Sequence, residues 1–599
     1  MKRTIGYVAC GLAAAAIFAS CGGNGSQDGS DTDVRISWDY NTFTEMNSVN
    51  VSNADYVEAN LCYPRIKRLS DGSLLMSFMD MHYGPNIYVR RSEDDGRTWS
   101  DAILLKHWYK AESTVGKDEV HYVNPDFIEL QDGRVMLAYQ WRYRYGYSDI
   151  PNTNNNCGVE IMFSGDKGKT WGESREIYRG RCWEPAMLQL PTGEIQMYIT
   201  SSQDVVDGVS YPRTMLIRSF DGGKTWQGKE MCGIDDNEAI SRTIDDRFAY
   251  DGMPTGVYLD DDKGIVVPLE VWHGSLVMDQ TPIVVRTDLE TNWRFDQKKI
   301  LEEGGPDFPD KKEVNKDFQG YGPYGCKIGT GEVLVLSNGT YKGAEGIWTF
   351  IGDRNADNFY HATSPFTGYW GSIDYIGDNK VIAAGSEKYR DKDGKIRYRV
   401  KAMTGRLNYS KTLAKGGLDM VPVEEFDTES NDCWFLGKAS ESSVFADFGY
   451  TDDCLEVGSY VFDSNIVSFT PENSDAAAIL VSRGKPGCYE NWQIISNAAG
   501  KFIVYKEFTR SWHKVYEGKV PVDIVGTVNY ASDTDLGYGV KVSVPWDVLG
   551  GKPAKGEVLR AHLRHYYKDT PKEKPLSLVE DQEGENTDYP QEWLKLILR

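Results

Sequence analysis

The chain has 599 residues, of which 40% are hydrophobic and 12% aromatic. This length provides material for two or more packed domains at roughly 100–200 residues each, and it excludes a disulfide mini-protein, a collagen and a disordered tail. The 66 Lys and Arg residues are outnumbered by 89 Asp and Glu residues, which gives a formal net charge of −23. A strongly negative surface repels phosphate backbones, so nucleic acid is not expected as a partner, whereas small neutral ligands remain open.

Residues 1–33 have the features of a processing signal and a tether. A basic start at Lys2 and Arg3 precedes an apolar run that is too short to cross a bilayer as a stable anchor, as in a secretory signal. Phe18-Ala19-Ser20-Cys21 resembles a bacterial lipobox, so we expect residues 1–21 to be a lipoprotein signal peptide and Cys21 to be lipidated; an ordinary signal cleaved nearby is the alternative. The acidic, Gly/Ser-rich residues 22–33 are typical of a flexible tether and resemble surface-export signals of Bacteroidetes lipoproteins. We expect a lipid anchor in the outer membrane, on the cell surface or the periplasmic face.

The cysteines and histidines do not indicate a metal centre. Apart from Cys10 and Cys21, eight cysteines are scattered without CxxC spacing, and the eight histidines form no HxH or HExxH motif. An exported location permits disulfides, but the sequence does not pair the cysteines. We therefore expect no cofactor, and a structural Ca²⁺ among the many carboxylates remains open.

A tight turn followed by an alternating apolar strand recurs six times along the chain. Gly, Asn and Asp in these turns supply the positive φ that hairpins require. Evenly spaced units of this kind, without intervening helical patterns, indicate an all-β protein with a six-bladed β-propeller over residues 34–423. The six turns are Ser70-Asp71-Gly72-Ser73, Gln131-Asp132-Gly133-Arg134, Pro191-Thr192-Gly193-Glu194, Asp262-Lys263-Gly264, Gly329-Thr330-Gly331-Glu332 and Gly377-Asp378-Asn379-Lys380.

A second repeat, of the form S-x-D-x-G-x-T-W, agrees with the first. It occurs at residues 92–99, 164–171 and 219–226. In each copy we expect Asp to cap a hairpin turn, Gly to permit the turn's backbone and Trp to pack between strands. The three copies resemble the Asp-boxes of sialidase-like propellers. This resemblance supports the predicted fold but gives almost no information about the protein's chemistry.

Residues 424–599 are again rich in strand patterns, and their number suits one β-sandwich. Val542-Ser-Val-Pro-Trp-Asp-Val-Leu-Gly and the closing Tyr589-Pro-Gln-Glu-Trp593 resemble family 9 carbohydrate-binding modules. This resemblance implies a carbohydrate-binding-like domain. Trp434, Trp492 and Trp512 are candidates for stacking on sugar rings, with a core position as the alternative.

Propellers bind ligands at one end of the central axis, where inner strands and loops converge. Each predicted blade carries polar or aromatic residues shortly before its hairpin turn, and we predict that these residues form a ring around the binding site. They are Tyr63-Pro64-Arg65, Tyr122-Val123-Asn124-Pro125, Cys182-Trp183-Glu184-Pro185, Tyr250-Asp251-Gly252-Met253, Tyr321-Gly322-Pro323-Tyr324 and Phe366-Thr367-Gly368-Tyr369-Trp370.

Glu184 and Glu270 are the candidate catalytic residues. Each precedes or follows an apolar strand and has aromatic neighbours, which can stack on sugar and raise the pKa of a carboxyl by desolvation. Glycoside hydrolysis needs one acid donor and one anionic partner because its transition state resembles an oxocarbenium ion. The alternative for either residue is a solvent-exposed Glu without function.

These motifs resemble glycoside hydrolase family 93. Trp183-Glu184-Pro185 and Asp251-Gly252-Met253 followed by Glu270 carry the likeness, which extends over roughly residues 60–410. The resemblance implies a six-bladed, retaining exo-α-1,5-L-arabinanase in which these two glutamates are the catalytic pair, with their individual roles unassigned. On this view the substrate is an oligo- or polysaccharide. Trp183 and Tyr324 line the sugar platform, Arg65, Asn124 and Asp251 bind hydroxyls, and Tyr369 completes the site.

Two other functions remain open. In an exo-sialidase, Arg65 would be the first of three arginines that bind a carboxylate, with Arg286 and Arg406 as the other candidates and Tyr369 near the position of the nucleophile. Arg65 could also be a strand-end residue paired with a neighbouring carboxylate. The second alternative is a surface lipoprotein that binds glycans without cleaving them.

Overall fold

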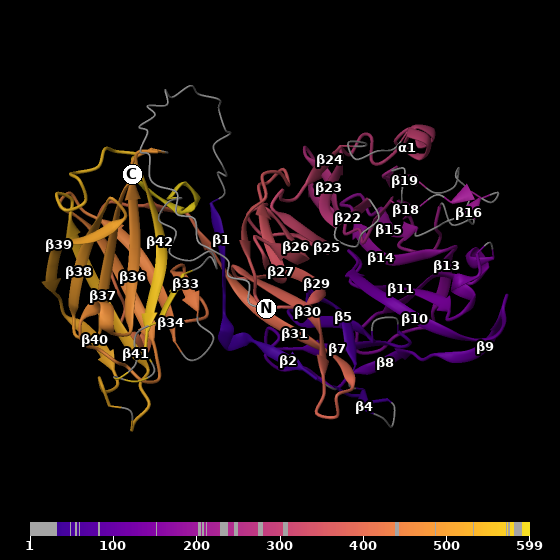
Figure 1. Cartoon of the computed structure of the whole chain (residues 1–599), viewed down its shortest axis with the longest axis horizontal. Coiled ribbons are helices and arrows are strands. Elements are labelled where there is room, and N and C mark those ends of the chain that lie inside the picture. Colours follow the sequence, from indigo (N-terminus) through magenta and orange to yellow (C-terminus); the bar gives the residue numbers. More distant parts are fainter. Residues whose placement is uncertain are drawn as a thin grey trace, which may run out of the picture.

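The computed structural model describes residues 33–599 apart from gaps at 48, 54–56, 59, 82–83, 151, 202–204, 207–208, 211, 228–237, 245–248, 274–279, 304–309, 438–441, 486, 531, 569, 571, 573–575 and 580–589. The predicted signal peptide, Cys21 and tether residues 22–32 lie outside the described residues. Within the described part, no helix combines the length and apolar character needed to span a membrane. Figure 1 shows two β-rich lobes side by side, the larger formed by the N-terminal two thirds of the chain.

Six antiparallel sheets surround the centre of the larger lobe, which confirms the predicted six-bladed propeller (Figure 1). We number these sheets as blades in chain order. Blade 1 consists of β5 (Leu61–Arg68), β6 (Leu74–Asp80), β7 (Ile87–Ser92) and β8 (Ile103–Lys106). Blade 2 consists of β9 (Tyr109–Ser113), β10 (Gly116–Glu129), β11 (Val135–Tyr143), β12 (Cys157–Ser164) and β13 (Arg175–Arg179). Blade 3 consists of β14 (Cys182–Gln189), β15 (Ile195–Ser201), β18 (Arg213–Ser219) and β19 (Glu238–Ser241).

The remaining three blades follow the same antiparallel order. Blade 4 consists of β20 (Ala249–Gly252), β21 (Val257–Asp260), β22 (Gly264–His273), β23 (Gln280–Thr287) and β24 (Lys311–Glu313). Blade 5 consists of β25 (Phe318–Lys327), β26 (Val333–Tyr341), β27 (Ala344–Gly352) and β28 (Tyr360–Thr363). Blade 6 consists of β29 (Tyr369–Gly377), β30 (Lys380–Arg390) and β31 (Ile396–Tyr409), joined by β1 (Val34–Trp38) and β2 (Thr44–Met46) from the other end of the propeller sequence.

The propeller ring is closed by its N-terminal strand. β1 pairs with β31 from Val34↔Tyr409 to Trp38↔Gly405, so blade 6 contains both ends of the propeller chain. Hydrophobic clusters lie between successive blades, and each is built from apolar residues of two neighbouring sheets. Because every sheet buries both faces in this way, the sequences of the inner strands are nearly continuous runs of apolar residues.

The three Asp-box turns have the geometry expected from their sequence. In the second copy, Asp166 accepts hydrogen bonds from the Thr170 N–H at 2.8 Å, from the Thr170 hydroxyl at 2.6 Å and from the Ser164 hydroxyl at 2.8 Å. Trp171 Nε1 donates to the Gly168 carbonyl at 3.1 Å. These turns lie between β7 and β8 in blade 1, between β12 and β13 in blade 2, and directly after β18 in blade 3.

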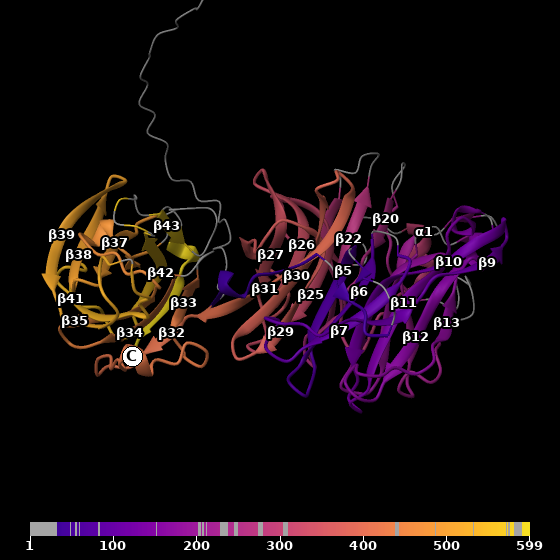
Figure 2. The ribbon, with the colours of Figure 1, turned by 90° about the horizontal axis from the view of Figure 1, so that it is seen from below.

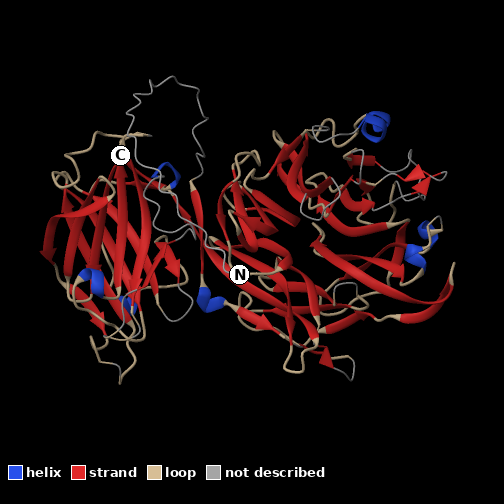
Figure 3. Ribbon diagram, in the orientation of Figure 1, coloured by secondary structure: helices blue, strands red, loops and turns tan. Residues whose placement is uncertain are grey.

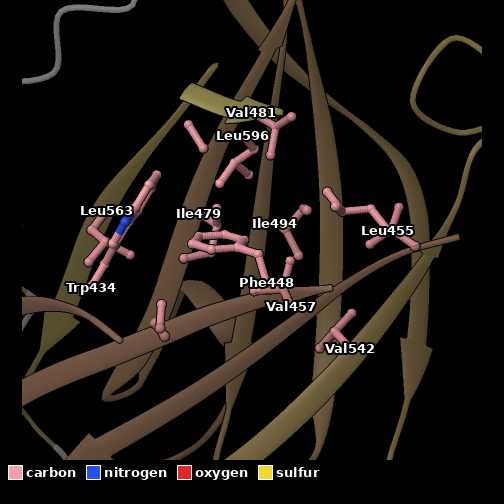
Figure 4. Close-up of a cluster of buried hydrophobic side chains, with 14 of the residues drawn as sticks. Trp434, Phe448, Leu455, Val457, Ile479, Val481, Ile494, Val542, Leu563 and Leu596 are labelled. Atoms are coloured by element: carbon pink, nitrogen blue, oxygen red, sulfur yellow. The ribbon is translucent and has the colours of Figure 1, made fainter. Parts of the chain in front are cut away.

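The smaller lobe is a β-sandwich of two sheets, as predicted. Its interior is the hydrophobic cluster in Figure 4, which draws side chains from both sheets. One sheet contains β32 (Lys411–Leu413), β36 (Ala476–Arg483), β37 (Glu490–Asn497), β38 (Lys501–Phe508), β39 (Ser511–Lys519), β42 (Val558–Tyr567), β43 (Leu576–Val579) and β44 (Leu594–Leu598). The other contains β33 (Trp434–Gly437), β34 (Ser443–Tyr450), β35 (Cys454–Phe462), β40 (Val522–Val525) and β41 (Gly537–Pro545).

Two details of this lobe differ from the sequence interpretation. β32 pairs in parallel with β44, so the sandwich begins before residue 424, because the chain leaving blade 6 is taken directly into the second lobe. Trp434 and Trp492 are fully buried in the core, where neither can stack on a sugar, whereas Trp512 is half-buried on the edge strand β39.

Helical segments are short (Figure 3). They are α1 (Gln297–Glu303) and the 3₁₀ turns η1 (Tyr40–Thr42), η2 (Gly146–Ser148), η3 (Thr153–Asn155), η4 (Val423–Glu425), η5 (Pro471–Asn473) and η6 (Pro590–Glu592). Two small hairpins complete the described elements, β3 (Val49–Asn50) with β4 (Val57–Glu58) and β16 (Val205–Val206) with β17 (Val209–Ser210). Figure 2 shows the propeller strands running between the two ends of the lobe.

Candidate active site

Each blade carries a left-handed backbone residue at the same place in its inner strand. In five blades the strand pairing shifts at this point, which marks a β-bulge, and in blade 4 the residue lies between β20 and β21. A proline follows it in five of the six blades. Bulges of this kind re-aim side chains, and a non-glycine residue with positive φ costs about 1–3 kcal/mol, a strain that clusters at functional sites. The six residues are Tyr63 (φ 57°), Asn124 (52°), Glu184 (54°), Met253 (49°), Gly322 (64°) and Trp370 (50°).

A second ring of residues faces these bulges. In every blade, the residue just before the bulge pairs with one residue on the second strand, which we call the latch residue. In five blades the latch side chain accepts a hydrogen bond from the bulge N–H of the next blade. Gln140 instead donates to the Cys182 carbonyl of the next blade. The latch residues are Met79, Gln140, Thr200, Glu270, Asn338 and Ser386.

Glu270 is the latch of blade 4 and the one carboxylate in this ring. Its Oε2 accepts a hydrogen bond of 2.6 Å from the Gly322 N–H. Its Oε1 accepts bonds from the Tyr250 hydroxyl at 3.0 Å and from Trp272 Nε1 at 3.1 Å. Burial raises the pKa of Glu270, while these three donors stabilise its charged form.

Glu184 is the bulge residue of blade 3. Its Oε2 accepts hydrogen bonds from the Thr200 hydroxyl at 2.9 Å and from the Met253 N–H at 3.2 Å. Burial, and then the negative charge of Glu270, raise its pKa to about 8, against the smaller opposing effects of the Thr200 and Met253 hydrogen bonds and of the Arg65 charge.

The structure therefore brings the two predicted carboxylates into one electrostatic unit. Each belongs to one of two adjoining blades, and Met253, which binds Glu184, directly follows Gly252, which pairs with Glu270. Because two nearby carboxyls resist carrying charge together, one of them keeps a proton near neutral pH. The three donors on Glu270 place the negative charge there and the proton on Glu184.

Arg65 and Tyr324 lie together near the central axis. Arg65 is buried, its Nη1 donates to the carbonyls of Pro64, Trp370 and Gly371 at 3.0–3.2 Å, and its guanidinium lies 3.7 Å from the centre of the Tyr63 ring. These bonds tie blade 1 to blade 6. Hydroxyl binding by Arg65 stays a prediction.

Tyr324 does not fill its predicted role as a sugar platform. It is 3% exposed, its hydroxyl donates to Asp126 Oδ1 at 3.1 Å, and the cations of Arg65 and Lys67 lie against its ring. The inner strands converge here, so the ring packs beneath the site and supports Arg65 rather than offering a face to ligand.

Three further predicted residues lie at or next to the bulges of blades 2, 3 and 6. Asn124 is a buried bulge residue whose Oδ1 has no hydrogen-bond partner in the described part of the chain. Trp183 is half-buried beside Glu184, with the Arg142 guanidinium 4.6 Å from its ring centre. Tyr369 precedes the bulge of blade 6 and is half-buried.

Asp251 is a second predicted site residue that the structure excludes. It is fully buried, and its Oδ2 forms an ion pair with Lys311 Nζ at 2.7 Å and accepts a hydrogen bond from Ser241. Side chains alternate along β20, so Tyr250 faces Glu270 while Asp251 points to the opposite side of the sheet. Asp251 therefore stabilises blade 4 and does not bind a hydroxyl.

The arginines proposed for a sialidase-type carboxylate site are not brought together. Arg286 pairs with Asp310 and Asp357 in the outer part of blades 4 and 5. Arg406 lies against Phe435 of the sandwich, away from Arg65. Neither arginine therefore joins Arg65 in the way that the sialidase alternative would require.

The sequence pattern placed Tyr250 in the predicted ring but did not assign Tyr250, Trp272 or Thr200 to holding the glutamates. Tyr250 and Trp272 donate to Glu270, and Thr200 donates to Glu184. Trp272 stands two positions after Glu270, and the alternation of a strand puts both on one face, so this signal was present. Thr200 carries no local signal, because its role depends on strand register.

No group of three or more His, Cys, Asp or Glu side chains gathers into a metal-binding arrangement among the described residues. Among the described cysteines, those at positions 62, 326, 433, 454 and 488 are free thiols.

The ion pair of Asp251 gives a test of its structural role. Replacing Lys311 by Met leaves a buried carboxylate without its cation, so we expect the free energy of unfolding to fall by about 3–5 kcal/mol in guanidinium denaturation followed by circular dichroism. Lys312→Met is the matched control: this lysine is half exposed in its pair with Asp357, and its loss should cost less than about 1 kcal/mol. Equal midpoints for the two variants would contradict the assignment.

Comparison with known proteins points to sialidase-like propellers. No family model matches the chain. A sialidase of Clostridium perfringens is 24% identical over 231 residues, which cover 34% of this chain and 58% of the relative. A sialidase of Micromonospora viridifaciens is 23% identical over 203 residues, covering 30% of this chain and 31% of the relative. The matches thus span less than two thirds of these relatives.

Among solved structures, an α-L-arabinanase of Penicillium chrysogenum in complex with arabinobiose is similar with a TM-score of 0.40 and 16% identity, over 60% of this chain and 98% of that one. The sequence matches and the six closed sheets agree on the fold: the larger lobe is a sialidase-like β-propeller.

Proposed function

We propose that the protein is a retaining exo-glycoside hydrolase that acts on polysaccharide side chains of the α-L-arabinan type. The observation that carries this proposal is the placement of two glutamates on adjoining blades: the Met253 N–H donates to Glu184, and the preceding Gly252 pairs with Glu270. The motifs around Glu184 and Glu270 that resemble family 93 support the arabinan-like substrate. Retention requires the two carboxyl groups to stand about 5–5.5 Å apart when substrate is bound.

The hydrogen bonds suggest a role for each glutamate. Glu270, held as an anion by three donors, attacks the anomeric carbon and forms a glycosyl-enzyme bond as the leaving oxygen departs. Glu184, which holds the proton, donates it to that oxygen. In the second step the Glu184 carboxylate takes a proton from water, the water oxygen attacks the anomeric carbon, and the bond to Glu270 breaks.

An exo-sialidase is the second candidate, favoured by the sequence similarity to sialidases. It requires cations for the substrate carboxylate, and the separation of Arg286 and Arg406 from Arg65 weighs against it. The third hypothesis is that the protein binds glycans without cleaving them.

Substrate screening with glutamate variants tests the function. We expect release of arabinose from arabinan with the retained anomer formed first, as followed by NMR, and no release of sialic acid from 3′-sialyllactose. Glu184→Gln and Glu270→Gln should each reduce kcat by about 10²–10⁴-fold, because each removes a proton donor or a nucleophile. Glu176→Gln on the outer strand β13 is the control and should be neutral. Unchanged hydrolysis in both active-site variants would refute the pair, and an inverted first product would refute retention.

The raised pKa of Glu184 predicts a pH profile. Glu184 must be protonated, so kcat/KM should persist below about pH 8 and fall as the pH rises through its pKa. Glu270 must be ionised, so activity should also fall on the acid side, at a pH above the ordinary range of a glutamate because burial raises its pKa. With an activated aryl arabinoside, whose leaving group needs no proton, Glu184→Gln should lose the alkaline limb. If activity of this variant still falls near pH 8, the group that titrates there is not Glu184.

The proposed location rests on the sequence pattern at the N-terminus. We place the enzyme at the outer membrane through a lipid on Cys21, where it would meet extracellular polysaccharide. Cys21→Ser should abolish incorporation of labelled palmitate and release the protein from the membrane fraction in a Gram-negative host. Cys10→Ser is the control and should leave both unchanged; labelling that persists in Cys21→Ser would contradict the anchor.

A further inference from the structure

Blade 5 carries a row of glycines across three neighbouring strands. Gly320 on β25 pairs with Gly339 on β26, and Gly339 pairs on its other side with Gly346 on β27. Glycine inside a strand weakens the sheet, and it often marks a place where a ligand or another backbone approaches closely. A Cβ at Gly339 would lie 2.2 Å from the Gln319 carbonyl oxygen, so no side chain fits there. These three glycines form a stretch of backbone without side chains, which we call the floor.

This floor is part of a hollow of about 350 Å³, which we call the blade-5 hollow. The hollow adjoins the catalytic pair. Tyr321, which lines it, stands between Gly320 of the floor and Gly322, whose N–H binds Glu270 at 2.6 Å. Burial and the nearby charge of Glu270 raise the pKa of Tyr321, in keeping with this proximity. The hollow is therefore one residue along β25 from the backbone N–H that binds Glu270, and Glu270 itself does not line it.

The lining of the hollow has the groups that bind sugar rings. Tyr321 and Tyr369 contribute half-buried aromatic rings. Gln319, Asn338 and Thr340 add amide and hydroxyl groups. Aromatic faces combined with a few fixed polar groups are typical of small-molecule sites, and amides and hydroxyls suit sugar hydroxyls.

The charges of the lining select between neutral and acidic sugars. Among the described residues that line the hollow there is no Lys or Arg, and Glu345 is the one carboxylate. A sugar acid placed here would face Glu345 without a cation to pair with, which is unfavourable. A neutral sugar ring needs only the dipoles of the amide and hydroxyl groups in the lining.

We propose that the blade-5 hollow is a subsite for a neutral sugar ring of the substrate, on the side of the cleaved bond nearest Glu270. This inference rests on the proposed function for its meaning, because it names the class of sugar that the catalytic pair would process. It excludes a sialic acid or uronic acid at this position.

Binding to a variant that cannot turn over tests the subsite. In isothermal titration calorimetry with Glu184→Gln, we expect arabinotriose to bind and 3′-sialyllactose not to bind. Adding Thr340→Trp fills the hollow and should weaken arabinotriose binding about tenfold or more. Adding Thr192→Trp, an exposed turn position at the far end of β14, is the matched control and should leave the affinity unchanged.

A milder substitution keeps the test valid if Thr340→Trp impairs folding. Gln319→Ala alters an exposed residue of the rim, and we expect it to weaken arabinotriose severalfold without shifting the melting temperature. Three outcomes would overturn the neutral subsite. Both variants could keep the parent's affinity for arabinotriose, arabinotriose could fail to bind at all, or 3′-sialyllactose could bind and be weakened by both variants. Failure of the proposed function looks different: Glu184→Gln and Glu270→Gln would keep hydrolysing, whatever the hollow binds.

Discussion

The active end of the propeller depends on one repeated contact, in which a backbone N–H of one blade is accepted by a side chain of the blade before it. Five of the six blades make this contact at the same register position. Each N–H belongs to a left-handed bulge residue, and a bulge leaves its own sheet's ladder incomplete. An unpaired buried N–H costs about 1–3 kcal/mol, so the neighbouring blade's acceptor stabilises both the bulge and the angle between blades.

Both glutamates occupy positions of this framework. Glu270 takes the place that Thr200, Asn338 and Ser386 fill in other blades, so a structural acceptor has become a carboxylate. Glu184 is itself a bulge residue. Thr200 connects the two patterns, because its hydroxyl accepts from the Met253 N–H at 2.9 Å and donates to Glu184 at 2.9 Å.

This arrangement explains how two acids of one type acquire different protonation. Both are desolvated, and burial alone would raise both pKa values. Glu270 is compensated by three donors, one of them a backbone N–H that the fold requires in any case, whereas Glu184 has two donors and experiences the charge of Glu270. The electrostatic asymmetry follows from the position of each residue in the ring. The blade-5 hollow, whose described lining holds no Lys or Arg, contains Tyr321, the residue before the N–H that binds Glu270.

Much of this molecule was readable from its sequence, because turn glycines, Asp-boxes and alternating strands are local signals. They predicted the six blades and the sandwich. The two glutamates were singled out by their aromatic neighbours and by the resemblance to family 93, and their catalytic role stays a prediction. Asp251 shows the limit. Its neighbours in sequence belong to the site, yet the alternation of β20 sends its side chain to Lys311, and Lys311 is distant in sequence. Tyr324 failed for a related reason, because convergence of the inner strands buries a ring that the sequence leaves free.

The glycines of the hollow show the same division. Gly320, Gly339 and Gly346 are unremarkable as separate residues, and only the pairing of three strands aligns them into one floor. The sequence by itself determined the period of the strands and the residue types available at each blade's entrance, since hydrogen bonding within a turn or strand is local. Tertiary structure decided which side chains share a face, which carboxylate is charged and where backbone is left bare, because register between strands and closure of the ring depend on contacts between residues far apart in the chain.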